Sequence, residues 1–416
     1  MTAEIAILNR SAVALAADSA ITVGRDRVWK NANKLFHLSD YTSIGIMIYG
    51  NGDYQGIAWE IIIKEFRRSI GNATFSTVAE AVKEFRNFLD GFEPPGKQYG
   101  DLALHFLIMD CVEDALDSVD SDEPSRIIRR DQFRAACSAL FAEELDGANW
   151  AKGIRRDTFI KRYTNDIKDL ANDMIDGSFA VTRAGWTQLY SLIYKRWTSK
   201  SETVLSSGVV FVGYGEDEIL PSLTDIVVDG RYGGRARCWI RKTRDLNDES
   251  SSSAYIIPFA QADIIHLFVE GLLPDVGVFI EQALERILRE KSDEVVRTYV
   301  PSNQEIVERS IQDRENAALI AAFHDEFAKF RQEITVRPML GVINTLPKEE
   351  MAAMAEALVD ITSLKRKVES PVETVGGPVD VAVISRGDGF VWIKRKHYFS
   401  PDLNQNFGYQ RNKRFG

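Results

Sequence analysis

Residues 5–22 read IAILNRSAVALAADSAIT, in which two apolar runs flank the polar Asn9-Arg10-Ser11 and end at Asp18. Short apolar runs separated by a polar turn are typical of a β-hairpin, and runs without alternation indicate strands buried on both faces. A third strand is predicted at residues 43–49, which lead into the glycine-rich turn Gly50-Asn51-Gly52-Asp53. The chain therefore opens with buried β-structure.

The pattern changes to helical spacing after this turn. Apolar residues recur every three or four positions over residues 59–70 and 78–89, and Glu93-Pro94-Pro95-Gly96 ends the second helix. Strands are predicted at residues 208–215, 223–228 and 254–258, followed by helices at 263–289, 303–333 and 349–367 and a closing hairpin at 379–385 and 390–394. This order predicts an α+β arrangement in which helices cover two β-sheets.

Composition excludes several classes of protein. The chain has 416 residues and is 45% hydrophobic, which rules out a disordered or fibrous protein. It has 51 Lys and Arg residues and 61 Asp and Glu residues, and the resulting net charge of −10 argues against a nucleic-acid partner. The apolar runs fall short of the ~20 residues that a membrane span needs, so no membrane association is expected.

Cysteine usage and the N-terminus point to the cytoplasm. Cys111, Cys137 and Cys238 show no CxxC spacing, which fits a reducing compartment. No basic and apolar signal-peptide pattern opens the sequence.

No metal or cofactor is predicted. The five histidines form no HExxH pattern or other paired metal-ligand spacing. Gly213-Tyr214-Gly215 resembles half of a dinucleotide-binding fingerprint, but it lacks the third glycine and three acidic residues follow it. We interpret it as a turn that ends a strand.

Four segments of the sequence carry a resemblance to a known family. They are residues 2–7 (TAEIAI), 12–22 (AVALAADSAIT), 30–36 (KNANKLF) and 376–386 (GGPVDVAVISR). On these segments the chain resembles the proteasome β-subunit and its bacterial relatives, which are N-terminal-threonine hydrolases. The resemblance covers roughly the first ninety and the last seventy residues.

The resemblance implies a four-layer αββα sandwich of the N-terminal-nucleophile hydrolase type with two large helical insertions. The N-terminal half of the core would be residues 1–96, the first insertion 97–206, and the middle strands and helix of the core 207–291. The second insertion would be residues 292–345, and the closing helix and strands 346–396. Residues 397–416 would form a C-terminal tail that is either flexible or docked on a neighbouring subunit.

The resemblance also implies a set of catalytic residues. A threonine hydroxyl needs a nearby base, and a chain-terminal threonine has one in its own α-amine. Removal of Met1 would expose Thr2 as that nucleophile. Lys34 matches the lysine that favours the neutral amine by like-charge repulsion, Asp18 matches the acid that holds this lysine, and Gly50 is the candidate oxyanion donor.

Each of these residues also has an ordinary alternative role. Asp18 could be a turn residue, Lys34 a surface lysine, and Gly50 a turn former. The chain also departs from the family pattern: Phe259-Ala260-Gln261 replaces its Gly-Ser-Gly turn, and Glu373 could replace its second acid only with a local shift. The second hypothesis is therefore a catalytically inactive member that serves as a scaffold or assembly subunit.

The predicted function is hydrolysis of peptide bonds in peptides or unfolded proteins. The resemblance further implies a ring-like homo-oligomer and an ATP-driven unfoldase as a partner. The inserted helices would either alter the ring geometry or form a lid over the catalytic chamber.

Overall fold

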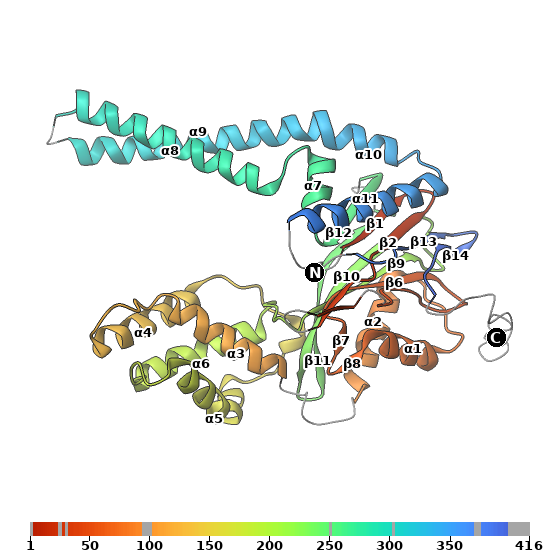
Figure 1. Cartoon of the computed structure of the whole chain (residues 1–416), viewed down its shortest axis with the longest axis horizontal. Helices are drawn as coiled ribbons and strands as arrows, with labels where there is room; N and C mark the ends of the chain where they lie inside the picture. The colour runs from red at the N-terminus through yellow and green to blue at the C-terminus, as the bar shows by residue number, and fades with distance from the viewer. Residues whose placement is uncertain are drawn as a thin grey trace. The chain divides into compact units, whose positions relative to one another are not determined.

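The computed structural model describes residues 3–23, 27–29, 32–93, 102–248, 252–301, 304–369 and 376–397. Contacts within the chain divide it into two units, the first comprising residues 1–35, 219–221 and 246–416 and the second comprising residues 36–218 and 222–245. Each unit contains a five-stranded sheet with antiparallel pairing and several helices (Figure 1). The predicted mixture of helices and antiparallel sheets is therefore confirmed, whereas the six segments and the four-layer stacking remain predictions.

The sheet of the first unit has the strand order β12-β1-β2-β13-β14. Its strands are β1 (Ala3–Asn9), β2 (Val13–Ala17), β12 (Ala254–Ala260), β13 (Asp380–Ser385) and β14 (Gly389–Lys394). The predicted first hairpin is confirmed, because β1 pairs antiparallel with β2 and both strands are buried along their whole length. β13, from the C-terminal part of the sequence, pairs with β2, so the N-terminal hairpin lies in the middle of the sheet. A separate ribbon pairs β3 (Ile21–Val23) with β4 (Arg27–Trp29).

The helices of the first unit are α7 (Asp263–Glu270), α8 (Pro274–Tyr299), α9 (Glu305–Arg331), α10 (Arg337–Ile343) and α11 (Lys348–Glu369), with a short π-helix at Gln332–Val336 before α10. Of these, α10 and α11 pack against one face of the sheet. α11 packs on β1 and β2, where Met351 and Leu358 join the apolar core formed by Ile5, Ile7 and Ala14. α8 and α9 form a long antiparallel helical hairpin (Figure 1).

The sheet of the second unit has the order β11-β10-β9-β6-β5. Its strands are β5 (Leu35–His37), β6 (Ser43–Gly50), β9 (Ser207–Tyr214), β10 (Ser222–Tyr232) and β11 (Arg235–Asp245), and a small ribbon joins β7 (Asp53–Tyr54) to β8 (Ile57–Ala58). The predicted turn at Gly213-Tyr214-Gly215 is where β9 ends.

Two groups of helices belong to the second unit. α1 (Trp59–Ile70) and α2 (Val78–Gly91) bury their apolar faces in a core with β6, β9 and β10, as their periodicity predicts. The other group is α3 (Leu102–Leu116), α4 (Arg126–Ala142), α5 (Arg156–Ile175) and α6 (Arg183–Thr198), with a 3-10 helix at Asn149–Ala151. These helices share a second core that includes Phe133, Phe159 and Trp197. In the described ranges we find no helix whose length and apolar character would suffice to cross a membrane.

Candidate active site

Asp18 directly follows β2, and its carboxylate is fully buried. Its Oδ1 accepts a hydrogen bond from the Ala3 N–H at 3.1 Å, and its Oδ2 accepts one from the Gly376 N–H at 2.9 Å. The Asp18 N–H in turn donates to the Ala3 carbonyl at 3.0 Å. A buried carboxylate needs such donors, because losing its hydration without them would be costly. Asp18 therefore joins the start of β1 to the segment that precedes β13.

Lys34 completes an ion pair with Asp18. Its Nζ lies 2.5 Å from Asp18 Oδ1, and the Lys34 side chain is 6% exposed. Lys34 is thus a buried lysine rather than a surface one. The structure brings together the two side chains that the resemblance assigns to the base system, within the first unit and beside the backbone of Ala3.

Glu4 is a third charged residue in this cluster, and the sequence analysis missed it. Its carboxylate is fully buried, and Oε1 lies 3.0 Å from Lys34 Nζ. A signal was present in the sequence, since Glu4 is the one charged residue within the apolar strand Ala3–Asn9. A charge in a strand buried on both faces requires a partner of opposite sign, and Lys34 supplies it.

Strand pairing places Glu4 on a definite face of the sheet. Ala17 lies opposite both Glu4 and Asp380 in the register of β1, β2 and β13, so these three side chains share one face. Ile5 and Ala16, their neighbours along the strands, belong to the core that faces the helices. Glu4 and Asp380 therefore lie on the sheet face opposite the helices.

Asp380 forms a second acid–lysine pair in the same row. Lys396 Nζ bonds Asp380 Oδ2, and the Lys396 N–H donates to Oδ1 at 2.8 Å. Both side chains are at least nine-tenths buried. The row therefore holds two separate buried pairs, Glu4 with Lys34 and Asp380 with Lys396.

The other predicted site residues are placed differently. Thr2 lies outside the described residues, as does Glu373. Gly50 belongs to the second unit, where it ends β6 with φ of +81°, and a Cβ there would come within 2.8 Å of the Ser206 carbonyl oxygen. A glycine is thus required at residue 50 for the pairing of β6 with β9, and its role as an oxyanion donor remains a prediction.

Strained backbone occurs next to the cluster. Ala260 has φ of +63° and lies opposite Ala3 in the register of β12 and β1. A left-handed conformation costs a residue with a Cβ about 1 kcal/mol or more. Ala260 is the middle residue of the segment that replaces the Gly-Ser-Gly turn expected from the resemblance. Gln261, the next residue, accepts a hydrogen bond from Arg366 of α11.

A second buried polar cluster lies in the second unit. Tyr49 donates a hydrogen bond to Asp225 Oδ2 at 2.8 Å, and Arg241 donates to the Tyr49 hydroxyl. Burial raises the pKa of Asp225 to about 6, and the hydrogen bond from Tyr49 offsets this only in part. Burial also lowers the pKa of Lys242, which lies opposite Asp225 on β11. No sequence pattern had marked these residues.

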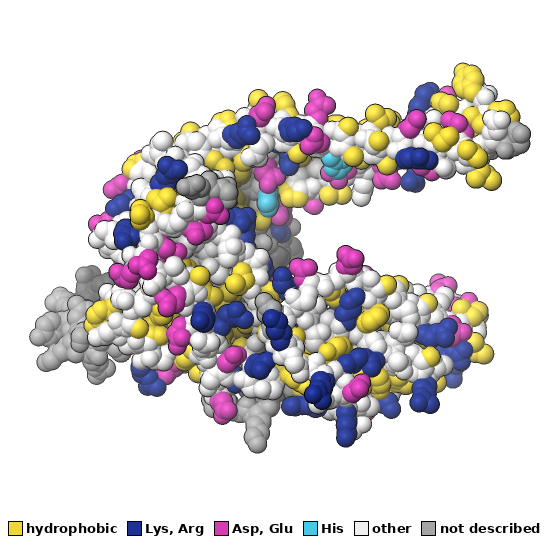
Figure 2. All heavy atoms as spheres, turned by 180° about the vertical axis from the view of Figure 1, so that it is seen from behind, with side chains coloured by type: hydrophobic (Ala, Val, Ile, Leu, Met, Phe, Trp, Pro, Cys, Tyr) yellow, Lys and Arg dark blue, Asp and Glu magenta, His cyan; other side chains and the backbone are white. Residues whose placement is uncertain are grey.

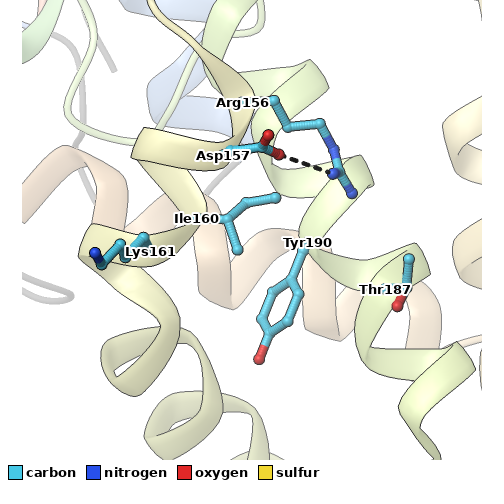
Figure 3. Close-up of a pocket in the computed structure, with 6 residues that line it drawn as sticks. All are labelled: Arg156, Asp157, Ile160, Lys161, Thr187 and Tyr190. Atoms are coloured by element: carbon cyan, nitrogen blue, oxygen red, sulfur yellow. Dashed lines mark ion pairs between the residues drawn. The ribbon is translucent and has the colours of Figure 1, made fainter.

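A pocket of about 290 Å³ lies between α5 and α6 (Figure 3). Its lining residues are Arg156, Asp157, Ile160, Lys161, Thr187 and Tyr190. Arg156 already pairs with Asp157 at 3.7 Å and donates to Ser191 at 2.8 Å, so its charge is largely satisfied within the helices. The described residues also contain no group of three or more His, Cys, Asp or Glu side chains arranged to hold a metal ion. The Asp18, Lys34 and Glu4 cluster is therefore the stronger candidate site.

Comparisons with known proteins correct the family resemblance. No family model matches the chain, and no curated protein matches it in sequence. Among solved structures it is similar to Anbu (ancestral beta-subunit) from Yersinia bercovieri, at 9% identity over 99% of this chain and 96% of that chain, with a TM-score of 0.30. It is also similar to a Gly-1 mutant of Anbu from Hyphomicrobium sp. strain MC1, at 9% identity over 100% of this chain and 96% of that chain, with a TM-score of 0.27.

The identification as a member of the proteasome β-subunit-like family was therefore wrong, because the structures found are Anbu proteins, which form a distinct family. Short matching segments led to that identification, and they do not extend to a family match over the chain. Neither similarity assigns an activity to this chain.

Proposed function

We propose that this chain is an N-terminal-nucleophile hydrolase that cleaves peptide bonds through Thr2 once Met1 has been removed. The observation that carries the proposal is the buried Asp18–Lys34 ion pair bonded to the Ala3 N–H. Thr2 is joined to Ala3 by one peptide bond, so the pair lies one residue from the new chain end. A buried ammonium at that position is what an N-terminal nucleophile requires to keep its α-amine neutral.

The mechanism assigns one role to each group. The Thr2 Oγ attacks the carbonyl carbon of the substrate, and the α-amine of Thr2 takes the hydroxyl proton. The amine then gives that proton to the leaving nitrogen as the peptide C–N bond breaks, which leaves an acyl ester on Thr2. Water, deprotonated by the same amine, hydrolyses the ester. Lys34 favours the neutral amine, and Asp18 fixes Lys34 through hydrogen bonds that also hold Ala3 and Gly376.

Three further features belong to this proposal. One is the four-layer αββα order expected of an N-terminal-nucleophile hydrolase. We also expect Gly50 to supply an oxyanion donor and the chain to act in the cytoplasm as a homo-oligomer. An ATP-driven unfoldase was implied only by the corrected resemblance, and we do not propose it.

The test compares protein prepared to begin at Thr2 with its Thr2→Ala variant and with a form that retains Met1. The first should hydrolyse members of a fluorogenic peptide library, whereas both of the others should be inactive although folded. Thr2→Ser is the matched control, because it keeps a hydroxyl and should retain part of the activity. An inactive protein that begins at Thr2 would contradict the proposal and support the scaffold hypothesis. Equal turnover by Thr2→Ala would also contradict the proposal, because the nucleophile would then be another residue.

A further inference from the structure

Lys34 is held between two carboxylates rather than one. Asp18 Oδ1 lies 2.5 Å and Glu4 Oε1 3.0 Å from its Nζ, and all three side chains are at least nine-tenths buried. A lone lysine–aspartate pair would be neutral. Glu4 places a second carboxylate beside the Lys34 ammonium, so it adds a negative charge to those of the Asp18–Lys34 pair.

The sign of this charge matters for a neighbouring amine. Interactions between charges are strong in a buried site because little water screens them. An ammonium alone favours a neutral amine, whereas a carboxylate favours a protonated one. Glu4 therefore opposes the effect of Lys34 on any amine at the start of β1.

Among the residues that the structure describes, the ion pairs near Glu4 involve groups from three parts of the first unit. Lys34 precedes β5, Asp18 follows β2, and Asp380 with Lys396 comes from β13 and the segment after β14. Asp380 lies in the same row as Glu4 but two strands away, which is about 10 Å at the usual strand spacing. Its own lysine neutralises it, so it should affect the Thr2 amine far less than Glu4 does.

We propose that Glu4 is a positioning residue that limits the positive charge Lys34 presents to the Thr2 amine and thereby sets the pH range in which the site works. This inference rests on the function proposed above. It assigns Asp18 and Glu4 different tasks. Asp18 fixes the ammonium to the backbone of Ala3 and Gly376, whereas Glu4 contributes a second negative charge beside Lys34 Nζ.

The experiment measures the pH–rate profile of peptide hydrolysis by protein confirmed to begin at Thr2. Glu4→Gln should move the midpoint of the rising limb to lower pH by about one unit, because removing the carboxylate makes protonation of the amine less favourable. Glu4→Asp keeps the charge and should keep the midpoint while lowering the rate. Asp380→Asn is the matched control, a buried acid of the same row, and its midpoint should match the wild type.

A second readout does not depend on peptidase activity. The rate at which an amine-selective acylating reagent modifies the α-amine of Thr2 can be followed against pH by mass analysis of the N-terminal peptide. Its midpoint should shift downward in Glu4→Gln as the hydrolysis profile does. A wild-type protein that begins at Thr2 but hydrolyses nothing would refute the proposed function, and this labelling would still test Glu4.

Three results would overturn the role of Glu4. One is an unchanged or higher midpoint in Glu4→Gln, and another is an equal downward shift in Asp380→Asn. Glu4→Ala provides a second neutral variant, for which the same downward shift is expected. The third result is that neither neutral variant folds while Glu4→Asp does. The charge of Glu4 would then serve the stability of the fold, and the proposed tuning would be wrong.

Discussion

Lys34 is the residue on which the proposed chemistry depends most. Lys34→Met removes the ammonium while keeping an unbranched apolar side chain, and it leaves Asp18 and Glu4 to favour a protonated amine. We expect the rising limb of the pH–rate profile to move upward by about one unit or more, with a lower rate at every pH. This shift is opposite in sign to the one expected for Glu4→Gln. A profile with the wild-type midpoint, measured on folded Lys34→Met that begins at Thr2, would remove Lys34 from the mechanism.

Asp225 gives a prediction about stability rather than activity. Its pKa is raised by burial from 3.8 to about 6, so between these values the folded state binds a proton more readily than the unfolded state. The free energy of unfolding should therefore fall as the pH rises from about 4 to about 6, by an amount on the order of 3 kcal/mol for this group.

Asp225→Asn removes this pH dependence. The amide can still accept the hydrogen bond from Tyr49, and it stays neutral. Relative to the wild type, the variant should become more stable on going from pH 4 to pH 7, as measured by urea unfolding at both values. A difference in unfolding free energy that is the same at the two pH values would show that Asp225 does not titrate in this range.

At the scale of single elements, the N-terminus of α2 shows how local sequence determines a helix boundary. Thr77 accepts a hydrogen bond from the Glu80 N–H at 3.1 Å, and the Glu80 carboxylate accepts one from the Ser76 N–H at 2.7 Å. Thr77→Ala should lower the free energy of unfolding by about 1 kcal/mol. Ser76→Ala keeps the backbone N–H and is the matched control. Equal urea midpoints for Thr77→Ala and the wild type would exclude a stabilising cap.

The elements near the start of the chain were the most predictable part of the fold. Local patterns were sufficient for the β1–β2 hairpin and for α1 and α2, because their apolar residues follow strand or helix spacing. Helix boundaries later in the chain were harder to place, since α8 continues to Tyr299 through charged residues that show no clear end signal.

The candidate site could be predicted only in part, because its contacts join distant parts of the chain. Asp18 and Lys34 were found through a resemblance that proved wrong at the level of the family. The Gly376 N–H that binds Asp18 lies 358 residues further along the sequence, and no local pattern indicates that contact. Glu4 was overlooked because a single charge in a buried strand predicts a partner of opposite sign but does not indicate which residue supplies it.

At the scale of the whole molecule, the α8–α9 hairpin leaves large apolar side chains exposed. Val296 of α8 is buried, but many apolar side chains on the two helices are exposed, and Figure 2 shows hydrophobic side chains among charged ones along this hairpin and at its end. The most exposed of them are Phe279 (65%), Tyr299 (80%) and Ile306 (85%). Soluble monomers rarely leave so much apolar surface uncovered.

We therefore expect a closed homo-oligomer in which α8 and α9 contact neighbouring subunits. Light scattering at micromolar protein should give a mass several times that of the 46.8 kDa chain. Phe279→Asp should reduce this mass without unfolding the protein, whereas a charge change on a residue that is already polar, Glu290→Lys, should have a smaller effect. A strictly monomeric wild type would refute the assembly.

The most direct test of the account is to map where an electrophile attaches to the protein. A β-lactone is opened by a nucleophilic hydroxyl to give a stable ester, so peptide mapping by mass spectrometry identifies the residue that attacked it. We predict an ester on Thr2 in protein that begins at this residue, slower formation of the same ester in Lys34→Met, and none in protein that retains Met1. Absence of the ester in the wild type, or equal labelling of the form that retains Met1, would contradict the claim that the Asp18–Lys34 pair serves an N-terminal nucleophile.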